Sequence, residues 1–205
     1  MKIQLALDRL TKKECCQILD QTKDSIDIIE VGTGVIKEYG MSIVKEIKQK
    51  YSTLTLLADM KTCDAGKSEA IQAFRSGADI MTVMAFSANQ TIMDTLSIAQ
   101  EYEKRVMIDL LGIQTRDRVK ELVYLGCDLF CIHLGKDMQQ HETLDINELL
   151  KLVDGLDVDV AIAGGVDATM IREIKQLPID IAIVGSAITS SENPKRVSEG
   201  IYDLI

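Results

Sequence analysis

The chain has 205 residues, of which 46% are hydrophobic and 27% are charged, enough for one sizeable domain with a buried core. A formal net charge of −9 gives a surface that repels a phosphate backbone, which argues against nucleic-acid binding. No apolar run reaches the ~20 residues of a membrane-spanning helix, and charge comes too early for a signal peptide. Five cysteines without metal-ligand spacing indicate reduced thiols, so we expect a cytoplasmic protein.

Short apolar runs alternate with amphipathic helical patterns along the whole chain. Between the second and third runs, for example, Ile43, Val44 and Ile47 recur at helical spacing. Continuous apolar strands separated by helices are typical of a parallel sheet covered on both faces. We predict eight strands, at residues 3–7, 26–31, 54–58, 80–84, 106–111, 129–133, 158–163 and 181–184.

The spacing of these strands favours a closed barrel. Their ends recur about every 25 residues, which is one strand–helix unit each time, and eight such units close a (β/α)8 TIM barrel. An open doubly wound sheet is the alternative, but no glycine-rich dinucleotide loop follows the first strand. No linker or second domain is visible, so residues 1–205 are expected to form a single barrel domain.

A cluster of charged residues follows the third predicted strand, where Asp59, Lys61 and Asp64 fall within six residues. Side chains alternate along a strand, so Asp59 and Lys61 should point to the same side. Asp64 stands where the next helix should begin, a favourable place for an acid. An ion pair with a helix cap would explain each residue alone, but the three together indicate a functional site.

Other predicted strands also end in polar residues. In such barrels the active site lies at the carboxyl ends of the strands, and Asp8, Glu30, Asp109 and His133 stand there. Asp8 and Asp109 could instead cap the following helices, and His133 could be a hydrogen-bonded core residue. Because separate strands all turn polar on one face, we expect these side chains to form one site.

The charges at the strand ends suggest a metal ion. Asp8, Glu30, Asp59 and Asp109 would bring four negative charges, and Lys61 would return one positive charge. Two like charges 4 Å apart cost about 4 kcal/mol even at an effective dielectric near 20, so such a ring needs a cation or raised pKa values. Oxygen ligands suit a hard ion, and we therefore predict Mg²⁺ as the cofactor.

Glycine turns follow the last two predicted strands, with Gly164 and Gly165 after the seventh and Gly185 and Ser186 after the eighth. Glycines let backbone N–H groups approach an anion closely, and barrels often hold a substrate phosphate at this place. Two tight turns without a ligand are the alternative. A phosphorylated substrate anchored here would place its reacting end over a metal, a lysine that stabilises an enediolate, and a histidine that carries a proton.

The residues also resemble a known family. The segment 59–64, Asp-Met-Lys-Thr-Cys-Asp, matches the DxKxxD motif of the orotidine 5′-monophosphate decarboxylase superfamily. Together with QLALD at 4–8, IIEVGT at 28–33 and AGG at 163–165, it resembles the branch that holds 3-hexulose-6-phosphate synthase and 3-keto-L-gulonate-6-phosphate decarboxylase. The resemblance covers essentially the whole chain and implies a (β/α)8 barrel.

This resemblance implies a role for each candidate residue. Glu30 and Asp59 would bind Mg²⁺, Lys61 would stabilise a 1,2-enediolate, and Asp8 would contact the substrate near the metal. Asp64 would reach into the active site of a neighbouring subunit, which makes the enzyme a homodimer. His133 would be a general acid or base, with Asp109 beside it. The backbone around Gly165, Gly185 and Ser186 would bind the phosphate.

Residues 133–137, His-Leu-Gly-Lys-Asp, bear on the two activities of this branch. The decarboxylases carry His-Arg-Ser-Arg-Asp there, and the synthases carry His-Thr-Gly-x-Asp. Gly135 and Asp137 follow the synthase pattern, Leu134 departs from it, and Lys136, a candidate substrate ligand, stands at the position of an arginine that lysine does not replace. Asp109 also favours the synthase, because the decarboxylases usually carry Glu there.

We therefore predict an aldehyde-lyase that condenses D-ribulose 5-phosphate with formaldehyde. The alternative is a carboxy-lyase, 3-keto-L-gulonate-6-phosphate decarboxylase, which uses the same enediolate. A non-catalytic sugar-phosphate-binding barrel would not need the charged cluster, and an epimerase-like isomerase would need more than the two histidines present. Residues 136–148 could form a mobile lid or a solvated loop.

Overall fold

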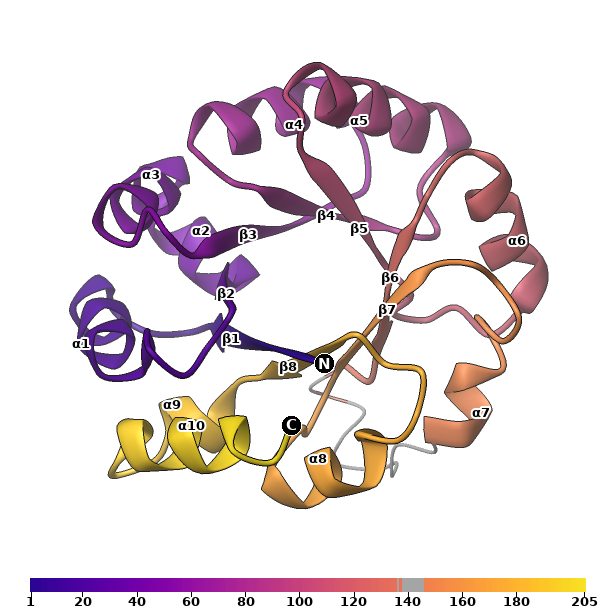
Figure 1. The fold of residues 1–205 in the computed structure, drawn as a ribbon. Coiled ribbons are helices and arrows are strands. Elements are labelled where there is room, and N and C mark those ends of the chain that lie inside the picture. Colours follow the sequence, from indigo (N-terminus) through magenta and orange to yellow (C-terminus); the bar gives the residue numbers. More distant parts are fainter. Residues whose placement is uncertain (136, 138–145) are drawn as a thin grey trace.

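Eight parallel strands form a closed barrel surrounded by helices in a computed structural model of the protein, which describes residues 1–135, 137 and 146–205 (Figure 1). The strands follow one another around the barrel in chain order, and β8 pairs with β1 to close it. The predicted (β/α)8 barrel is confirmed, and the open doubly wound sheet is wrong because that fold leaves two free edges. Within the described residues, no helix is long and apolar enough to cross a membrane.

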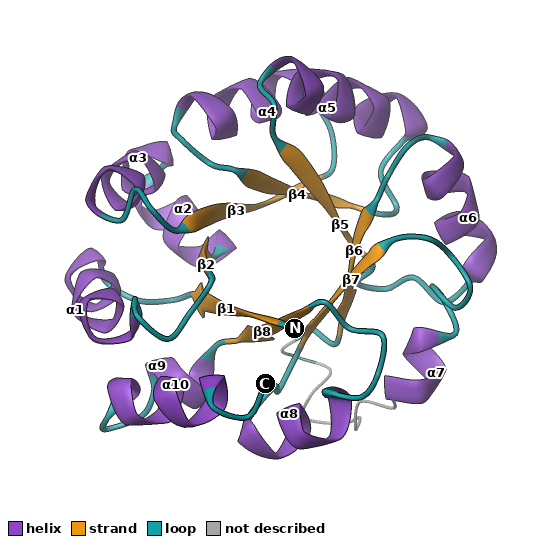
Figure 2. Ribbon diagram, in the orientation of Figure 1, coloured by secondary structure: helices purple, strands orange, loops and turns teal. Residues whose placement is uncertain are grey.

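Strands and helices alternate along the chain, with the strands inside and the helices outside (Figure 2). The strands are β1 (Lys2–Leu7), β2 (Ile28–Val31), β3 (Thr55–Thr62), β4 (Ile80–Met84), β5 (Arg105–Asp109), β6 (Leu129–His133), β7 (Asp159–Ala163) and β8 (Ile181–Val184). The helices are α1 (Lys12–Thr22), α2 (Thr33–Tyr39), α3 (Met41–Lys50), α4 (Gly66–Arg75), α5 (Asn89–Glu101), α6 (Arg116–Tyr124), α7 (Ile146–Leu150), α8 (Ala168–Ile174), α9 (Ser186–Thr189) and α10 (Pro194–Tyr202).

Two apolar layers hold this architecture together. The larger one fills the space between the sheet and the helices. The smaller one fills the barrel interior and consists of Ile28, Leu57, Ile80, Met107, Leu129, Cys131, Ala161, Ala163, Ile181 and Ile183. Because strand side chains alternate, residues two positions beyond these also face inward, and several are polar. Glu30 follows Ile28 in this way, so the interior changes from apolar to charged toward the carboxyl ends of the strands.

The third strand is longer than predicted. Strand β3 continues to Thr62, four residues past the predicted end, whereas the other predicted ends agree to within two residues. The register between β3 and β4 shifts between Ala58 and Thr62, and Lys61 has a left-handed backbone with φ 47°. The charged residues therefore stand on an irregular strand end rather than in a loop.

The start of the next helix also differs from the prediction. Helix α4 begins at Gly66, and its N-cap is Ala65 with φ 53° and no side-chain cap. Asp64 lies two residues before the helix and is exposed, so its predicted place at the start of the helix is wrong.

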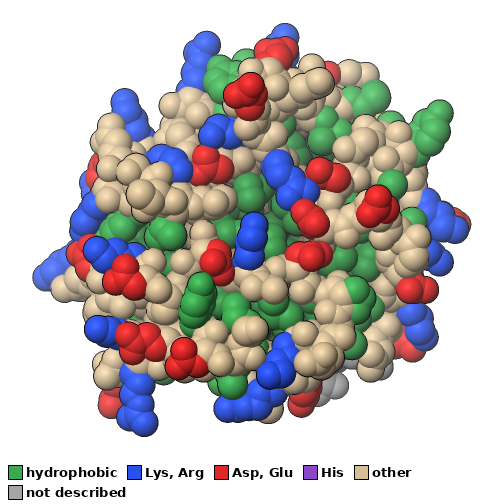
Figure 3. Space-filling model, viewed as in Figure 1, with side chains coloured by type: hydrophobic (Ala, Val, Ile, Leu, Met, Phe, Trp, Pro, Cys, Tyr) green, Lys and Arg blue, Asp and Glu red, His purple; other side chains and the backbone are tan. Residues whose placement is uncertain are grey.

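Opposite charges are mixed over the face of the molecule seen in Figure 3, where acidic and basic side chains alternate without a broad patch of one sign. This distribution gives a polyanion no basic surface on that face.

Candidate active site

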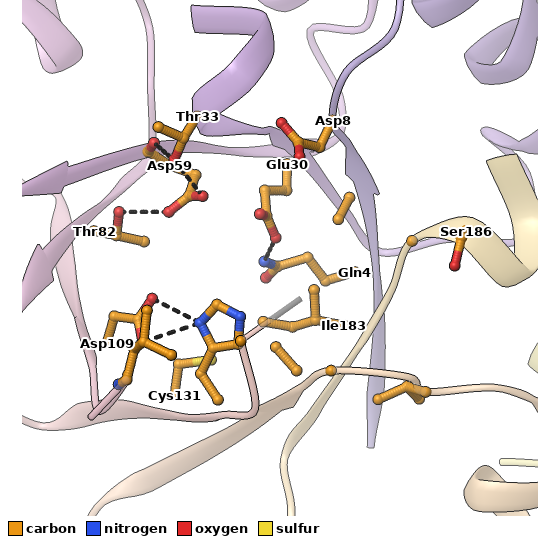
Figure 4. Close-up of a pocket in the computed structure, with 18 of the residues that line it drawn as sticks. Gln4, Asp8, Glu30, Thr33, Asp59, Thr82, Asp109, Cys131, Ile183 and Ser186 are labelled. Carbon is orange, nitrogen blue, oxygen red and sulfur yellow. Dashed lines mark hydrogen bonds and ion pairs between the residues drawn. The ribbon is translucent and has the colours of Figure 1, made fainter. Parts of the chain in front are cut away.

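A cavity of about 480 Å³ contains most of the residues predicted from the strand ends. Figure 4 shows labelled side chains from β1, β2, β3, β4, β5, β6 and β8 around it. The predicted residues that line it are Asp8, Glu30, Asp59, Lys61, Asp109, His133, Gly164, Gly165, Gly185 and Ser186. The structure thus brings together side chains that are up to 178 positions apart in the sequence.

The centre of the site is a chain of charged contacts. The Lys61 ammonium lies 2.7 Å from Oδ2 of Asp109 and 3.3 Å from Oδ1 of Asp59. Nδ1 of His133 lies 2.9 Å from the same Oδ2 of Asp109. Asp109 therefore orients a cation and an imidazole toward one cavity. The prediction that Asp59 and Lys61 share a side is confirmed, although the strand is irregular between them.

The surroundings keep Lys61 and Asp109 charged. Burial works against the charge of Lys61, but the carboxylates of Asp59 and Asp109 outweigh it and raise the pKa of Lys61 above its usual range. Burial would likewise raise the pKa of Asp109, but hydrogen bonding to His133 and the nearby Lys61 ammonium lower it to about 2. At neutral pH the site thus presents a fixed ammonium in a partly buried cavity, where its electrostatic effect is stronger than in water.

Two threonines hold Asp59 in place, and neither was predicted. Thr33 Oγ1 donates to Oδ2 of Asp59 over 2.7 Å, and Thr82 Oγ1 donates to Oδ1 over 2.8 Å (Figure 4). Thr82 also accepts from the backbone N–H of Lys61. A sequence signal for Thr82 exists, because it is the polar residue in the middle of an otherwise apolar strand, IMTVM.

Glu30 lies beside this chain of contacts and is buried. Only 9% of the residue is exposed, and its Oε2 accepts from Nε2 of Gln4 over 2.5 Å. Burial, together with the nearby charge of Asp59, raises the pKa of Glu30 to about 8. The surrounding protein thus compensates the charge of Glu30 incompletely, as expected where a cation binds.

These residues fit Mg²⁺ better than a metal that needs a full protein cage. Among the described residues there is no group of three or more His, Cys, Asp or Glu side chains placed to hold an ion. Mg²⁺ is commonly bound through one or two carboxylates, with water and substrate oxygens completing its shell. All four predicted carboxylates line the cavity, but Lys61 and His133 engage Asp109, and Asp8 caps α2. Glu30 and Asp59 are therefore the pair that would hold the ion.

Asp8 lies at the edge of the cavity and caps a helix. Its Oδ1 accepts from the N–H of Gly34 in α2 over 2.8 Å, and its Oδ2 lies 3.2 Å from Nε of Arg9. The predicted alternative, a cap for the following helix, is wrong in detail because Thr11 caps α1. A Cβ on Gly34 would lie 2.6 Å from Oδ1 of Asp8, so this contact requires glycine.

The glycine turns form the other side of the cavity. Gly164 and Gly165 have φ values of 112° and 72°, which favour glycine. A Cβ on Gly164 would lie 2.5 Å from the carbonyl oxygen of Leu134. Gly185 precedes the short helix α9, and the hydroxyl residues Ser186, Thr189 and Ser190 line the same part of the cavity. Sequence analysis missed Thr189 and Ser190, because nothing in their local pattern distinguishes them from a helix end.

Two predicted residues are not part of the cavity as described. Asp64 is exposed and does not line the cavity of its own chain. Lys136 lies outside the described residues, as does most of the segment 136–148.

Comparison with known proteins assigns a family to this arrangement. The family model described as orotidine 5′-phosphate decarboxylase / HUMPS family matches residues 1–201. The 3-hexulose-6-phosphate synthase of Bacillus subtilis (strain 168) is 33% identical, over 100% of this chain and 99% of that protein. The synthase of Mycobacterium gastri is 34% identical, with both chains covered completely.

Solved structures give the same result. The 3-hexulose-6-phosphate synthase from Salmonella typhimurium superposes with a TM-score of 0.96 at 34% identity, covering 100% of this chain and 98% of that one. The 3-keto-L-gulonate-6-phosphate decarboxylase from Vibrio cholerae has a TM-score of 0.89 at 26% identity, covering 99% and 96%. The protein is an enzyme of the carbon–carbon lyase class. The chain belongs to the orotidine 5′-phosphate decarboxylase / HUMPS family.

Proposed function

We propose that the protein is a 3-hexulose-6-phosphate synthase, which joins D-ribulose 5-phosphate to formaldehyde. The observation that carries the proposal is the Lys61 ammonium held by Asp59 and Asp109, with His133 on the same Asp109. This arrangement combines an electrostatic partner for an enediolate with a proton carrier. The synthases at 33–34% identity over the whole chain support the choice of substrate.

We infer that Mg²⁺ binds between Glu30 and Asp59. The two inward-facing carboxylates, with the raised pKa of Glu30, are the donor set that supports this inference. When bound, the ion would supply positive charge next to the oxygens of the enediolate. Thr33 and Thr82 keep both oxygens of Asp59 oriented by their hydrogen bonds.

The protein's own side chains account for the remaining steps. His133 takes a proton from C1 of ribulose 5-phosphate, and the Lys61 ammonium stabilises the negative charge left on the enediolate oxygens. C1 then forms a bond to the formaldehyde carbon, and the formaldehyde oxygen receives the proton. Asp109 holds His133 and Lys61 in position throughout. The turns at Gly164 and Gly185 would anchor the phosphate.

The activity is tested with two substrates in the presence of Mg²⁺. Ribulose 5-phosphate with formaldehyde should give hexulose phosphate, and ribulose 5-phosphate alone should exchange its C1 hydrogen with D₂O. Release of CO₂ from 3-keto-L-gulonate 6-phosphate without any consumption of formaldehyde would instead establish the carboxy-lyase. The control is the protein after treatment with EDTA, which should lose either activity and regain it with Mg²⁺.

We further infer a homodimer located in the cytoplasm. Asp64 is exposed, lies outside the cavity of its own chain and follows the active-site strand β3 directly. It is therefore accessible to a second subunit, as the resemblance in its motif implies. The five free cysteines accord with a reducing compartment.

A further inference from the structure

A glutamine at the bottom of the cavity has no role in the mechanism given above. Gln4 is completely buried in β1 and pairs in register with Ile28 of β2 and Ile183 of β8. Both neighbours belong to the apolar interior of the barrel. Gln4 thus places an amide at a level of the barrel where its strand neighbours are hydrocarbon, and it lines the cavity. A buried amide in such a place calls for hydrogen-bond partners on both of its ends.

One end of this amide has a partner and the other has none. Nε2 donates to Oε2 of Glu30 over 2.5 Å, so the nitrogen end of the amide faces Glu30. The carbonyl oxygen Oε1 is thereby turned away from Glu30. It is buried and has no hydrogen-bond partner among the described residues. Figure 4 shows the amide of Gln4 directed across the cavity floor toward Glu30.

A ligand that brings a donor into the cavity would supply the missing partner. The ammonium of Lys61, which lines the same cavity, is already engaged by two carboxylates. The next inward-facing residue of β1 is Ala6, whose small side chain leaves room above Gln4. A substrate phosphate or carbonyl oxygen cannot donate, whereas each hydroxyl group of a sugar phosphate can.

We propose that Gln4 is a substrate-binding residue whose Oε1 accepts a hydrogen bond from a secondary hydroxyl of the sugar phosphate. The proposal builds on the function proposed above and adds a contact to it. The same amide then hydrogen-bonds to both the carboxylate of Glu30 and a hydroxyl of the substrate, and so fixes the position of one relative to the other. A substrate that lacks this hydroxyl would leave the buried Oε1 without that hydrogen bond, which favours polyhydroxylated ligands over deoxygenated ones.

The test is a double-mutant cycle between the residue and the ligand. Calorimetry at saturating Mg²⁺ and without formaldehyde measures the affinity of ribulose 5-phosphate and of its 3-deoxy and 4-deoxy analogues. Wild-type protein should bind one deoxy analogue roughly 10-fold more weakly than ribulose 5-phosphate. Gln4→Met should bind ribulose 5-phosphate more weakly by a similar factor and should show no further loss with that analogue.

Two further variants make the result decisive. Ile183→Val removes one methylene beside Gln4 and should keep the wild-type discrimination between the ligands. Gln4→Asn shortens the side chain and should reproduce the loss, which covers the case in which Gln4→Met does not fold. Thermal unfolding without ligand should show Gln4→Met folded but less stable than wild type, because the substitution removes the donor of the hydrogen bond to buried Glu30 together with the unpaired acceptor.

The proposal is overturned if the variants at Gln4 discriminate between the ligands as strongly as wild type does. It is also overturned if both deoxy analogues bind wild type as tightly as ribulose 5-phosphate does. Failure of wild type to bind ribulose 5-phosphate at all would contradict the proposed function as well, and that result is distinct from either of these.

Discussion

Lys61 shows how a single residue combines strain, burial and charge. Its backbone has φ 47°, a left-handed conformation that costs a non-glycine residue roughly 1–2 kcal/mol. Its N–H donates to Thr82, and its ammonium lies between the carboxylates of Asp59 and Asp109. Backbone strain of this kind persists where the surroundings over-determine a conformation, often at functional sites. We interpret the strain as the consequence of aiming the ammonium into the cavity.

Replacement of Lys61 by alanine should therefore lower the rate far more than the affinity. We expect Lys61→Ala to lose ~10²-fold or more in kcat, because a preorganised charge acts mainly on the transition state. The affinity for ribulose 5-phosphate, measured by calorimetry, should change only a few-fold if the glycine turns anchor the phosphate, as proposed above. Lys45→Ala, at an exposed position of α3, is the control and should match wild type. Equal loss of rate and affinity would contradict the assigned role.

The sequence predicted the charged residues of the site better than the neutral residues that hydrogen-bond to them. Asp59, Lys61 and Asp109 were visible because charge follows an apolar strand directly. Gln4 and Thr33 were not predicted, since each is a common neutral residue and its role depends on which carboxylate lies opposite. These side chains come to face a carboxylate only when separate strands close into a barrel, so no local sequence pattern predicts the contact.

At the scale of the element, the end of strand β3 could not be predicted from the local hydrophobic pattern. The apolar run ends at Ala58, but the strand continues through charged residues to Thr62. The backbone carbonyl of Thr62 accepts from the hydroxyl of Ser87, and the side chain of Thr62 hydrogen-bonds to Glu69 of α4. Tertiary contacts thus extend the strand where hydrophobicity predicts its end.

The packing of helix α4 against α5 (Asn89–Glu101) yields a prediction about two glycines. A Cβ on Gly66 would collide with the carbonyl oxygen of Thr91 and lie 2.5 Å from the hydroxyl of Thr95. Gly66→Ala should therefore destabilise the fold by about 1–3 kcal/mol through overpacking. Gly200→Ala, in α10 with no atom within 4 Å of its Cβ, should stabilise by about 0.5–1 kcal/mol.

Urea unfolding at pH 7 measures both changes. Because the two variants make the same chemical change at helical positions, opposite signs isolate the effect of packing. If Gly66→Ala is as stable as wild type, the close approach of α4 to α5 is not essential.

At the scale of the whole molecule, Asp79 connects three parts of the barrel at the amino-terminal end of the strands. It accepts from the ammonium groups of Lys48 and Lys104, at 2.6 and 2.7 Å, and from the N–H of Leu56 in β3. Burial alone would raise the pKa of Asp79, but the hydrogen bonds from Lys104, Lys48 and Leu56 lower it below its usual value.

Asp79 should therefore contribute to stability in a pH-dependent way. A carboxyl group with a lowered folded-state pKa stabilises fully above its unfolded pKa of about 3.9 and loses this effect as pH falls through the folded value. Asp79→Asn should cost about 1–3 kcal/mol at pH 7 in urea unfolding, and the difference should shrink below pH ~4. Asp24→Asn, at an exposed position, should cost almost nothing at any pH. If the difference in unfolding free energy between Asp79→Asn and wild type stays constant from pH 7 to below pH ~4, the loss of stability comes from altered packing and not from the lost charge.

The closed barrel itself was predictable from the sequence pattern, whereas the contact of Asp64 with a second subunit stays a prediction. Eight even units indicate closure because each apolar strand must pair on both sides and be covered by a helix. Asp64 is exposed and does not line the cavity of its own chain. A role for Asp64 therefore depends on a second copy of the chain.

Complementation between two inactive variants tests that role. If Asp64 serves the neighbouring site, Asp64→Ala and Lys61→Ala impair different sites of a mixed dimer, and one site regains both residues. Refolding the two variants together should restore about a quarter of the wild-type activity, because half of the dimers are mixed and each has one intact site. Lys61→Ala with His133→Gln is the control, since both residues serve the same chain's site and no mixture can restore it. Recovery in the control, or none in the test pair, would place Asp64 outside the catalytic site.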